Sequence, residues 1–449
     1  MESKSVARSE SLTRRCAKCR AQEATLDSRS QAVCKDCFMN FIATKCIKQI
    51  AILGKETRPP PSTSGGPPTG TRRYLLGLSL GVSSTVLLHL LNGNIEFQLG
   101  KGRNAPFELV VVHVDTSNLS SEQNQPHDQP SAAAAALDAY RQRYPRFTFH
   151  CVPLSSIFDP STPTPIDWSS LIFGLSLPKF QSTSNPQQSL HSLLTSLPRT
   201  AAAHADILRL LTRHILVSQS HLHNCQALLL GHSTTALAEL TLAETAKGRG
   251  FSLPWLINDG PSPIDAIITS PNSNTNHTTT NSNSSNNSSS EHNSNGTTNT
   301  SGKTSGLLVY HPLRDALRAE LRTYAALASL AVPADADLAG PATAATSATG
   351  GKTAVVSHKD LSIEQVMANY FAEVETNYPS VVANVARTTG KLVRIGLEEG
   401  GEGGERCGLC RMPLDEAGDE RWRGELGEGI ETQGDGGKLC YGCERSTVR

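Results

Sequence analysis

The sequence has few aromatic residues and few methionines, which limits how much of its 449 residues can form a packed core. Phe, Trp and Tyr together make up 5% of the chain, and hydrophobic residues make up 38%. Polar residues are also unevenly spread, since the stretch near 270–305 is almost entirely Asn, Ser and Thr. Such a stretch buries too little apolar surface to fold. We therefore expect one main domain with small appendages, about 300 folded residues in all.

The chain also lacks a net charge, because 41 basic residues balance 41 acidic ones. This balance excludes a global field that would draw the protein to nucleic acid or to a membrane surface. Any contact with RNA must then come from local patches, although runs of like charge are usually solvated surface. The basic residues near the N-terminus are Arg8, Arg14, Arg15, Lys18 and Arg20.

Long apolar runs are missing as well. No stretch of about 18 apolar residues indicates a membrane span, and the first thirty residues lack the apolar segment of a signal peptide. We expect a cytoplasmic protein that does not associate with a membrane. In a reducing compartment, the eleven cysteines favour metal binding over disulfides.

Eight of the eleven cysteines fall into four C-x-x-C pairs. Two such pairs can complete a tetrahedral four-thiolate site, so the pattern predicts about two structural zinc ions with no open coordination position. Closure within each end of the chain is favoured over sites shared between the two ends, and a redox C-x-x-C would not explain four pairs. The predicted metal ligands are Cys16, Cys19, Cys34, Cys37, Cys407, Cys410, Cys440 and Cys443.

Between the cysteine pairs, short apolar runs alternate with helical stretches. Near-continuous apolar strands separated by helices are typical of a parallel sheet that is covered on both faces. The predicted fold class is therefore α/β, a Rossmann-like doubly wound domain flanked by two zinc-binding modules. The expected strands are 74–80, 108–114, 147–152, 227–231 and 307–310, and the expected helices are 35–53, 85–91, 201–219, 235–247, 312–330 and 362–378.

These patterns divide the chain into domains and linkers. The predicted parts are an N-terminal cysteine module with its helix (14–53), a linker (54–71), the α/β domain (72–332), a mobile linker (333–358), a helical segment (359–396) and a C-terminal cysteine module (406–445). Three segments of the α/β domain are rich in Ser, Pro, Asn or Gln, and we expect them to be disordered insertions. They lie near 116–135, 156–198 and 259–305.

A loop of small residues joins the first strand to its helix within LLGLSLGVSSTVLLHLL. A loop of this kind, followed by a helix N-terminus, can present backbone N–H groups to a phosphate. A plain strand, turn and helix with serine caps would give the same pattern. The candidate phosphate-binding residues are Ser79, Gly81, Ser83 and Ser84.

Further candidates follow later strands. His232 and Ser233 stand after an apolar run, at the carboxyl end of a strand, where open α/β sheets bind ligands. His311 and Arg314 occupy a similar position and could face the same crevice. Helix capping and packing are the alternative interpretation of all four residues.

In their order along the chain, these motifs resemble a known family. The loop resembles a decayed Ser-Gly-Gly-x-Asp-Ser pyrophosphate loop, and LLLGHSTTALAELTLAETAKGRG resembles the Gly-His-Asn-x-Asp-Asp segment of the same enzymes. With the cysteine pairs and NYPSVVANVARTTGKL, the chain resembles the cytoplasmic tRNA 2-thiolation protein 2 family. The resemblance implies a PP-loop fold of the adenine nucleotide alpha hydrolase type.

The resemblance also implies a role and partners. Such a protein would form a heterodimer with the catalytic subunit of the tRNA thiolase and would help to hold tRNA through Arg and Lys side chains. The pair would make 2-thiouridine (the thiolated base of mcm5s2U) at the wobble position of tRNAs for Lys, Glu and Gln. The sulfur would come from a thiocarboxylated ubiquitin-related modifier.

This sequence departs from the catalytic pattern. Leu80 stands where active relatives have a glycine that lets the pyrophosphate approach, and Ser83 stands where an aspartate would help to hold Mg²⁺. Thr234 and Thr235 occupy positions that are acidic in active members. Active relatives also carry a C-x-x-C near the start of the helix at about Ala201, but LLTSLPRTAAAHADIL contains no cysteine. The sequence thus predicts a non-catalytic subunit and argues against ATP binding.

Two other functions stay open at this point. The chain could itself be an ATP-dependent tRNA sulfurtransferase with unusual ligands, or a zinc-finger scaffold in protein urmylation. Three cysteines, Cys46, Cys151 and Cys225, lie outside the pairs. For Cys151 and Cys225, which lie among apolar residues at strand edges, an inert buried thiol is favoured over a nucleophile.

Overall fold

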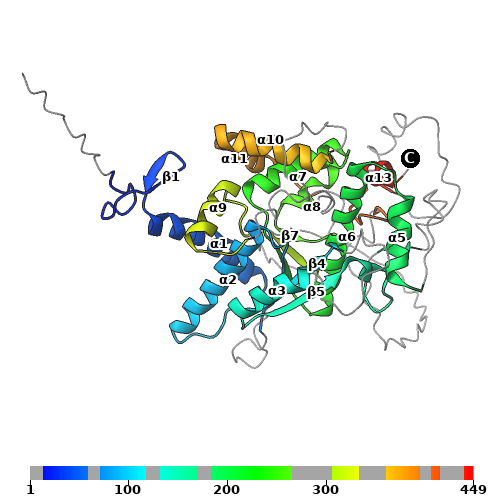
Figure 1. Cartoon of the computed structure of the whole chain (residues 1–449), viewed down its shortest axis with the longest axis horizontal. Coiled ribbons are helices and arrows are strands. Elements are labelled where there is room, and N and C mark those ends of the chain that lie inside the picture. The colour runs from blue at the N-terminus through cyan, green and yellow to red at the C-terminus, as the bar shows by residue number, and fades with distance from the viewer. Residues whose placement is uncertain are drawn as a thin grey trace, which may run out of the picture.

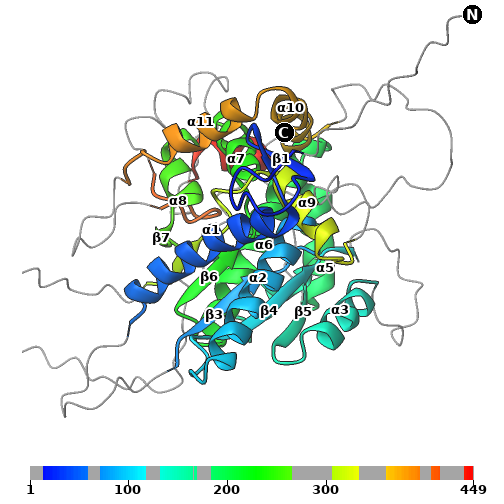
Figure 2. The same ribbon diagram turned by 90° about the vertical axis from the view of Figure 1, so that its left-hand side faces the viewer.

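The computed structural model of this chain describes nine stretches, which together contain every predicted metal ligand and every candidate of the phosphate loop. A central sheet carries helices on both faces, and the two cysteine modules lie on opposite sides of it (Figures 1 and 2). The described residues are 14–58, 71–117, 132–164, 166–168, 184–264, 306–332, 361–394, 406–414 and 439–447.

The sheet has six strands in the order β5-β4-β3-β6-β8-β7, and all but β7 run parallel. From β3 the chain moves outward to β4 and β5, returns to β6 on the other side of β3, and then continues to β8. The predicted doubly wound α/β class is confirmed. The strands are β3 (Arg73–Gly77), β4 (Glu108–Asp115), β5 (Thr148–Pro153), β6 (Ala227–Leu230), β7 (Gly260–Pro261) and β8 (Leu308–Tyr310).

Alternation along the strands divides the core into two layers, one on each face of the sheet. Leu75 of β3 and Leu228 of β6 point into one layer, and Leu76 and Leu229 point into the other. Successive side chains of a strand face opposite sides, so a strand that is covered on both faces must be apolar throughout. This is why the strands were recognisable as continuous apolar runs.

Helices of the α/β domain cover both layers. Helices α2, α3 and α9 lie on the face that contains Leu76, while α5, α6 and α8 lie on the face that contains Leu75. Their bounds are α2 (Val82–Gly100), α3 (Ala132–Arg143), α5 (Pro186–Ser196), α6 (Ala201–Leu222), α7 (Thr234–Ala246), α8 (Leu253–Ile257) and α9 (Arg318–Leu327), with 3-10 turns η2 (Leu154–Phe158) and η3 (Gly250–Ser252).

Helix α5 lies within the segment 156–198, which we expected to be a disordered insertion on its composition. The helix begins with Pro186 after Asn185, whose side chain accepts a hydrogen bond from the Gln187 backbone N–H at 2.9 Å. Its Leu190 and Leu193 are buried against η2, so a short amphipathic stretch was hidden by polar neighbours. Two further expected insertions are folded in part, because residues 132–135 begin α3 and residues 260–261 form β7, which pairs with β8. The expected linker at 54–71 also begins too early, since 54–56 end the N-terminal helix. Other parts of these segments lie outside the described residues: 59–70, 118–131, 169–183, 265–305 and 333–358.

Elements outside the α/β domain pack on it from the two ends of the sequence. Helix α1 contacts α2 and α9, α10 and α11 pack on α7, and α13 packs on α6 (Figure 1). The bounds are β1 (Leu26–Ser28), β2 (Gln31–Val33), α1 (Lys35–Glu56), α10 (Ile363–Asn377), α11 (Pro379–Thr389) and α13 (Tyr441–Thr447).

By length and composition, α1 alone among the described helices is apolar enough to cross a membrane. In the fold it is instead a packed helix, because Phe38, Ile42, Ile50 and Leu53 form one stripe that is buried in the core. Its remaining faces include lysines and other polar side chains. The same stripe explains the apolar composition of the helix.

A buried carboxylate, Asp206 of α6, joins three helical elements. It accepts hydrogen bonds from Lys247 Nζ at 2.8 Å, from both terminal nitrogens of Arg249 at 2.8 and 2.6 Å, and from Ser446 Oγ of α13 at 2.7 Å. Burial alone would raise the pKa of Asp206, but Arg249, Arg209 and Lys247 together hold it well below its usual range. The carboxylate thus ties the C-terminal module to α6 and to the end of α7.

Replacing this carboxylate should cost much of the stability. We expect Asp206→Asn to lower the free energy of unfolding by about 3–5 kcal/mol, since it leaves buried cations uncompensated. Asp138→Asn is the matched control, because Asp138 forms an exposed ion pair with Arg141 at 2.6 Å and should change stability by less than about 1 kcal/mol. Urea unfolding followed by circular dichroism measures both, and equal effects would contradict the role of Asp206.

Candidate metal centres and phosphate loop

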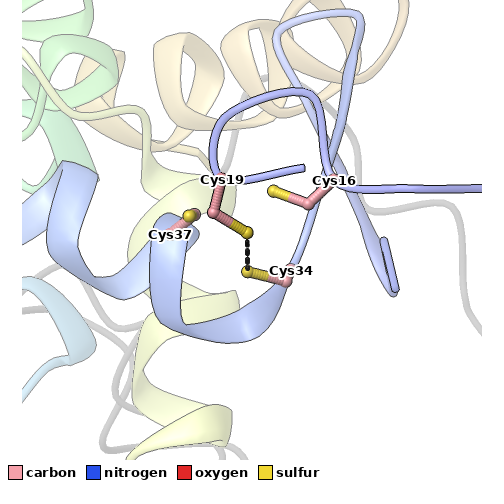
Figure 3. A group of neighbouring side chains, drawn as sticks. All are labelled: Cys16, Cys19, Cys34 and Cys37. Carbon is pink, nitrogen blue, oxygen red and sulfur yellow. Dashed lines mark hydrogen bonds between the residues drawn. The ribbon is translucent and has the colours of Figure 1, made fainter. Parts of the chain in front are cut away.

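The first candidate metal centre lies in the N-terminal module and is built from a tight turn and a helix start. Cys16 and Cys19 lie on the turn, which is closed by a hydrogen bond from the Arg20 N–H to the Cys16 carbonyl at 2.9 Å. Cys34 directly precedes α1, and Cys37 lies in its first turn. Figure 3 shows the four side chains converging, with Cys19 Sγ 3.8 Å from Cys34 Sγ.

The second candidate centre, in the C-terminal module, repeats the same plan. A hydrogen bond of 2.9 Å from the Arg411 N–H to the Cys407 carbonyl closes the turn that carries Cys407 and Cys410. Cys440 precedes α13 and Cys443 lies within that helix. Arg411, like its counterpart Arg20, has a left-handed backbone, with φ of 59° and 58° respectively.

The geometry of both centres suits one tetrahedral metal ion each. Within each set of four cysteines, the Sγ atoms all lie within 4.8 Å of one another. A zinc ion about 2.3 Å from four sulfurs would place them about 3.8 Å apart, and Sγ of Cys410 and Cys440 are 3.8 Å apart. A disulfide would need about 2.05 Å, and all eleven cysteines are free. Each set closes locally and can hold a metal ion.

The two centres differ in their surroundings. All four cysteines of the C-terminal centre are buried, whereas Cys19 of the N-terminal centre is exposed. Arg249 donates from Nη2 to Cys443 Sγ at 3.4 Å, and the same guanidinium binds Asp206. Four thiolates around a divalent ion carry a net charge of about −2, so Arg249 also provides counter-charge. The C-terminal centre is therefore part of the core of the α/β domain.

Backbone N–H groups favour the thiolate form in the N-terminal centre. The N–H of Cys19 above all, together with those of Cys34 and Lys18, lowers the pKa of the Cys16 thiol to about 6, against the effect of burial. A metal ligand must be deprotonated, so this turn is suited to coordination at neutral pH.

The loop Ser79–Ser84 follows β3 and runs into the first turn of α2, and the hydroxyls of Ser79 and Ser84 bond within it. Ser79 Oγ lies 3.1 Å from Ser84 Oγ and accepts from the Gly81 N–H at 3.4 Å, and Ser84 Oγ donates to the Gly81 carbonyl at 3.1 Å. Leu80 has a φ of 65°, a conformation that favours glycine. Its side chain packs against the core. The hydroxyls of Ser79 and Ser84 thus have hydrogen-bond partners within the loop.

The turn after β6 packs closely against the start of α2. A Cβ atom added at Gly231 would lie 2.8 Å from both the Cα and the N atom of Ser84. Only a glycine permits two backbones to approach so closely. The turn after β6 therefore lies directly against the first turn of α2, where a phosphate loop would present its backbone N–H groups.

Residues of the second motif are also bonded within the chain. Ser233 is the N-cap of α7, and its hydroxyl accepts from the Ala236 N–H at 3.1 Å. Thr234 Oγ1 donates to the Arg314 carbonyl at 2.7 Å, and Thr235 Oγ1 donates to Glu375 of α10 at 2.9 Å. Thr234 and Thr235, which the resemblance aligns with acidic residues of active relatives, thus connect α7 to the turn after β8 and to α10.

Basic side chains gather beside this motif, at the carboxyl ends of β6 and β8. The rings of His232 and His311 stack with centroids 5.1 Å apart. His311 Nδ1 lies 3.1 Å from Asp259 Oδ1, and Arg314 Nη1 donates to Asp259 Oδ2 at 2.7 Å. Burial above all lowers the pKa of both imidazoles, and the nearby charge of Arg213 on α6 adds to this effect.

Sequence reasoning missed Asp206 and Arg213. Both lie on α6, whose buried face contains almost every residue from Ala203 to Ser220. The sequence did contain a sign of these buried charges. Asp206, Arg209 and Arg213 recur at helical spacing on a face that is otherwise apolar. Charged residues in such positions are rarely buried unless they have a partner.

The fold and the centres define a doubly wound α/β protein with two four-cysteine modules, one at each end of the sequence. A family profile described as cytoplasmic tRNA 2-thiolation protein 2 matches residues 362–429. The protein of that description from Phaeosphaeria nodorum is 34% identical over 438 residues, covering 96% of this chain and 94% of the relative. The one from Pyrenophora tritici-repentis is 31% identical over 440 residues, covering 97% and 94%. The chain belongs to the cytoplasmic tRNA 2-thiolation protein 2 family, and the predicted resemblance is confirmed.

A solved structure shows a more distant similarity. The U34-tRNA thiolase NcsA from Methanococcus maripaludis, with its 4Fe-4S cluster, superposes with a TM-score of 0.48 and 15% sequence identity. The superposition covers 92% of this chain and 97% of the thiolase.

Two cysteines outside the centres should be unreactive in the folded protein. Burial raises the pKa of the Cys46 and Cys225 thiols to about 12, which lowers the thiolate fraction at neutral pH roughly 10³-fold relative to a free cysteine. We expect N-ethylmaleimide to leave both unmodified in the native protein and to label both after guanidinium unfolding. Peptide mass spectrometry measures this, and rapid native labelling of Cys225 would identify it as a reactive thiol.

Proposed function

We propose that this chain is a non-catalytic subunit of a cytoplasmic tRNA thiolase. Family membership gives it a role in cytoplasmic tRNA 2-thiolation. The observation that supports a non-catalytic role is the loop Ser79–Ser84, in which Ser79 Oγ bonds to Ser84 Oγ and accepts from the Gly81 N–H that could otherwise meet a phosphate. Thr234 and Thr235 add to this, because they bond to the chain itself and offer no carboxylate for Mg²⁺.

The sulfur chemistry would then belong to a catalytic partner subunit. The start of α6, where active relatives carry a cysteine pair, contains Asp206 in its charged network and no cysteine. In the proposed heterodimer, the partner binds ATP and takes sulfur from a thiocarboxylated ubiquitin-related modifier. The product is 2-thiouridine at the wobble position of tRNAs for Lys, Glu and Gln.

We propose that the N-terminal module helps to hold the tRNA. Four of the five basic residues near the N-terminus are exposed around the turn that carries Cys16 and Cys19. The fifth, Arg8, lies outside the described residues. Contacts of this kind are electrostatic, and they should weaken steeply as salt is raised, because the release of counterions from the RNA becomes less favourable. The four exposed residues are Arg14, Arg15, Lys18 and Arg20.

The metal in both centres is proposed to be zinc with a structural role. Cys16, Cys19, Cys34 and Cys37 would hold one ion at the start of α1. Four thiolates fill a tetrahedral shell and leave no position for a substrate. When bound, the ion fixes a turn against a helix start, and the residues around the two centres position α1 and α13 on the α/β domain. The second ion would be held by Cys407, Cys410, Cys440 and Cys443.

Zinc content tests the metal assignment. Elemental analysis of the purified chain should give about two zinc ions, and Cys34→Ser or Cys440→Ser should each lower the count to about one. Cys151→Ser is the control, because Cys151 belongs to neither centre. Cys440→Ser should lower the melting temperature more than Cys34→Ser, since the C-terminal centre is wholly buried. One zinc or none in the unmodified chain would refute two locally closed centres.

Activity of separated subunits tests the non-catalytic role. With ATP, tRNA and a sulfur donor, the isolated chain should form no AMP above background, because Ser83, Thr234 and Thr235 stand where acidic Mg²⁺ ligands are needed. Adding the catalytic partner should give both AMP and 2-thiouridine. AMP formation at enzymatic rates by the isolated chain would support the alternative of an active sulfurtransferase. A chain that neither binds the partner nor affects thiolation would support the alternative of a scaffold in protein urmylation.

A further inference from the structure

The basic residues at the carboxyl ends of β6 and β8 converge from three different elements. His232 follows β6, His311 follows β8, and Arg213 comes from the middle of α6. Because β6 and β8 are adjacent parallel strands, the turns that follow them lie side by side. The place is next to the reversal of strand order between β3 and β6, where open α/β sheets bind their ligands.

Arg213 lacks the kind of partner that other enclosed arginines of this region have. Its side chain is 9% exposed, no carboxylate of the described residues lies within 4.0 Å of it, and its Nε has no partner. Its one hydrogen bond goes from Nη2 to the Trp255 carbonyl at 3.5 Å. Four arginines of this region instead meet a carboxylate, whereas Arg394 bonds to backbone carbonyls of Pro254, Asn258 and Asp259. The four pairs are Arg209 with Glu244, Arg249 with Asp206, Arg314 with Asp259 and Arg318 with Glu239.

A buried guanidinium without a direct ion pair is costly. Burial lowers the pKa of Arg213 to about 10, so the group still carries its charge at neutral pH. Removing an ion from water is unfavourable unless a counter-charge compensates. Glu244 and the Cys410 thiolate favour the charge of Arg213 from a distance, but neither forms an ion pair with it, and its Nε keeps an N–H group that a further anion could accept from.

The two histidines present open nitrogen atoms beside this charge. His311 is fully buried, and its Nδ1 faces Asp259, whose carboxyl pKa is held below its usual range by His311 and Arg314 despite burial. Nδ1 therefore donates to Asp259, and Nε2 is left without a partner. Nδ1 of the half-buried His232 is also unpartnered. Each of these atoms becomes an N–H donor when its ring takes up a proton, which a nearby anion favours.

The charges decide what kind of ligand fits. A pair of imidazole nitrogens could bind a metal cation, but Arg213 repels a cation, and Asp259 is already bound by His311 and Arg314. A phosphate group meets every requirement, because it carries negative charge and accepts hydrogen bonds from the planar fork of a guanidinium and from imidazolium N–H groups. His232, the least buried of the three residues, would form the entrance.

We propose that Arg213, His232 and His311 form a binding site for a phosphate group, separate from the loop Ser79–Ser84. Whereas the hydroxyls of Ser79 and Ser84 bond within that loop, the charged Arg213 and the unpartnered imidazole nitrogens lie beyond β6, on the side of β8. The phosphate could belong to a free phosphate ion, a nucleotide or the RNA backbone, all of which present the same oxygens. The site does not depend on the proposed thiolase role, since each can fail without the other.

The test is phosphate binding by the full zinc-loaded chain. At pH 7 and constant ionic strength, replacing potassium chloride with potassium phosphate should raise the melting temperature in a saturable way, and the ³¹P resonance of phosphate should broaden. Arg213→Met should weaken binding at least about tenfold, and His232→Asn should also weaken it. Arg103→Met is the control, because Arg103 is exposed and lies before β4, at the opposite edge of the sheet; it should bind phosphate like the unmodified chain.

Competition identifies the source of the phosphate. Displacement of inorganic phosphate by AMP at lower concentration would indicate a nucleotide, displacement by a tRNA anticodon stem-loop would indicate the RNA backbone, and failure of both would leave the free ion as the ligand. Each of these results supports the site. The absence of saturable binding by the unmodified chain, or equal binding by Arg213→Met and His232→Asn, would overturn it. His232→Asn keeps the test decisive if Arg213→Met fails to fold, because His232 is only half-buried.

Discussion

The network around Asp206 is the interaction on which the arrangement of the molecule depends. Asp206 is completely buried, yet it is ionised, because Lys247, Arg249 and Ser446 all donate to it. The same Arg249 reaches Cys443 of the C-terminal centre. The Asp206 carboxylate thus connects α6 with the end of α7 and with α13 of the C-terminal module. Without it, several buried cations would lose their compensation at once.

The position of this network matters for function. In catalytic relatives the start of the corresponding helix carries a cysteine pair, according to the resemblance that the sequence suggested. Here the same helix start carries Asp206, and its neighbours are cations. In this chain the first turns of α6 therefore contribute a charged network and no cysteine, which is consistent with the proposed subunit that positions other components.

Much of the fold could be predicted from the sequence, because the strands covered on both faces are apolar throughout. The strand expected at 227–231 forms β6 (Ala227–Leu230), and the helix expected at 201–219 forms α6 (Ala201–Leu222). The cysteine pairs were recognisable because metal ligation requires fixed spacing. Helix α5 was missed because its polar neighbours obscured a short apolar stripe.

The arrangement at the carboxyl edge of the sheet could be predicted only in part. The loop Ser79–Ser84 was located correctly, but the close contact of Gly231 with Ser84 is a tertiary feature without a local signal. The same holds for Arg213, whose lack of a carboxylate becomes visible only once its neighbours are known to be paired. Pairing of charges across elements depends on packing, and a single sequence does not reveal it.

The central claim is that this chain is required for thiolation but does not use its phosphate loop for catalysis. Its most direct test is mass spectrometry of wobble nucleosides in tRNA from cells whose only copy carries Ser79→Ala and Ser83→Ala. Cells without the chain should lack 2-thiouridine, and cells with the double variant should contain it at the normal level. Loss of 2-thiouridine in the variant at normal protein abundance, or its persistence in cells without the chain, would contradict the account.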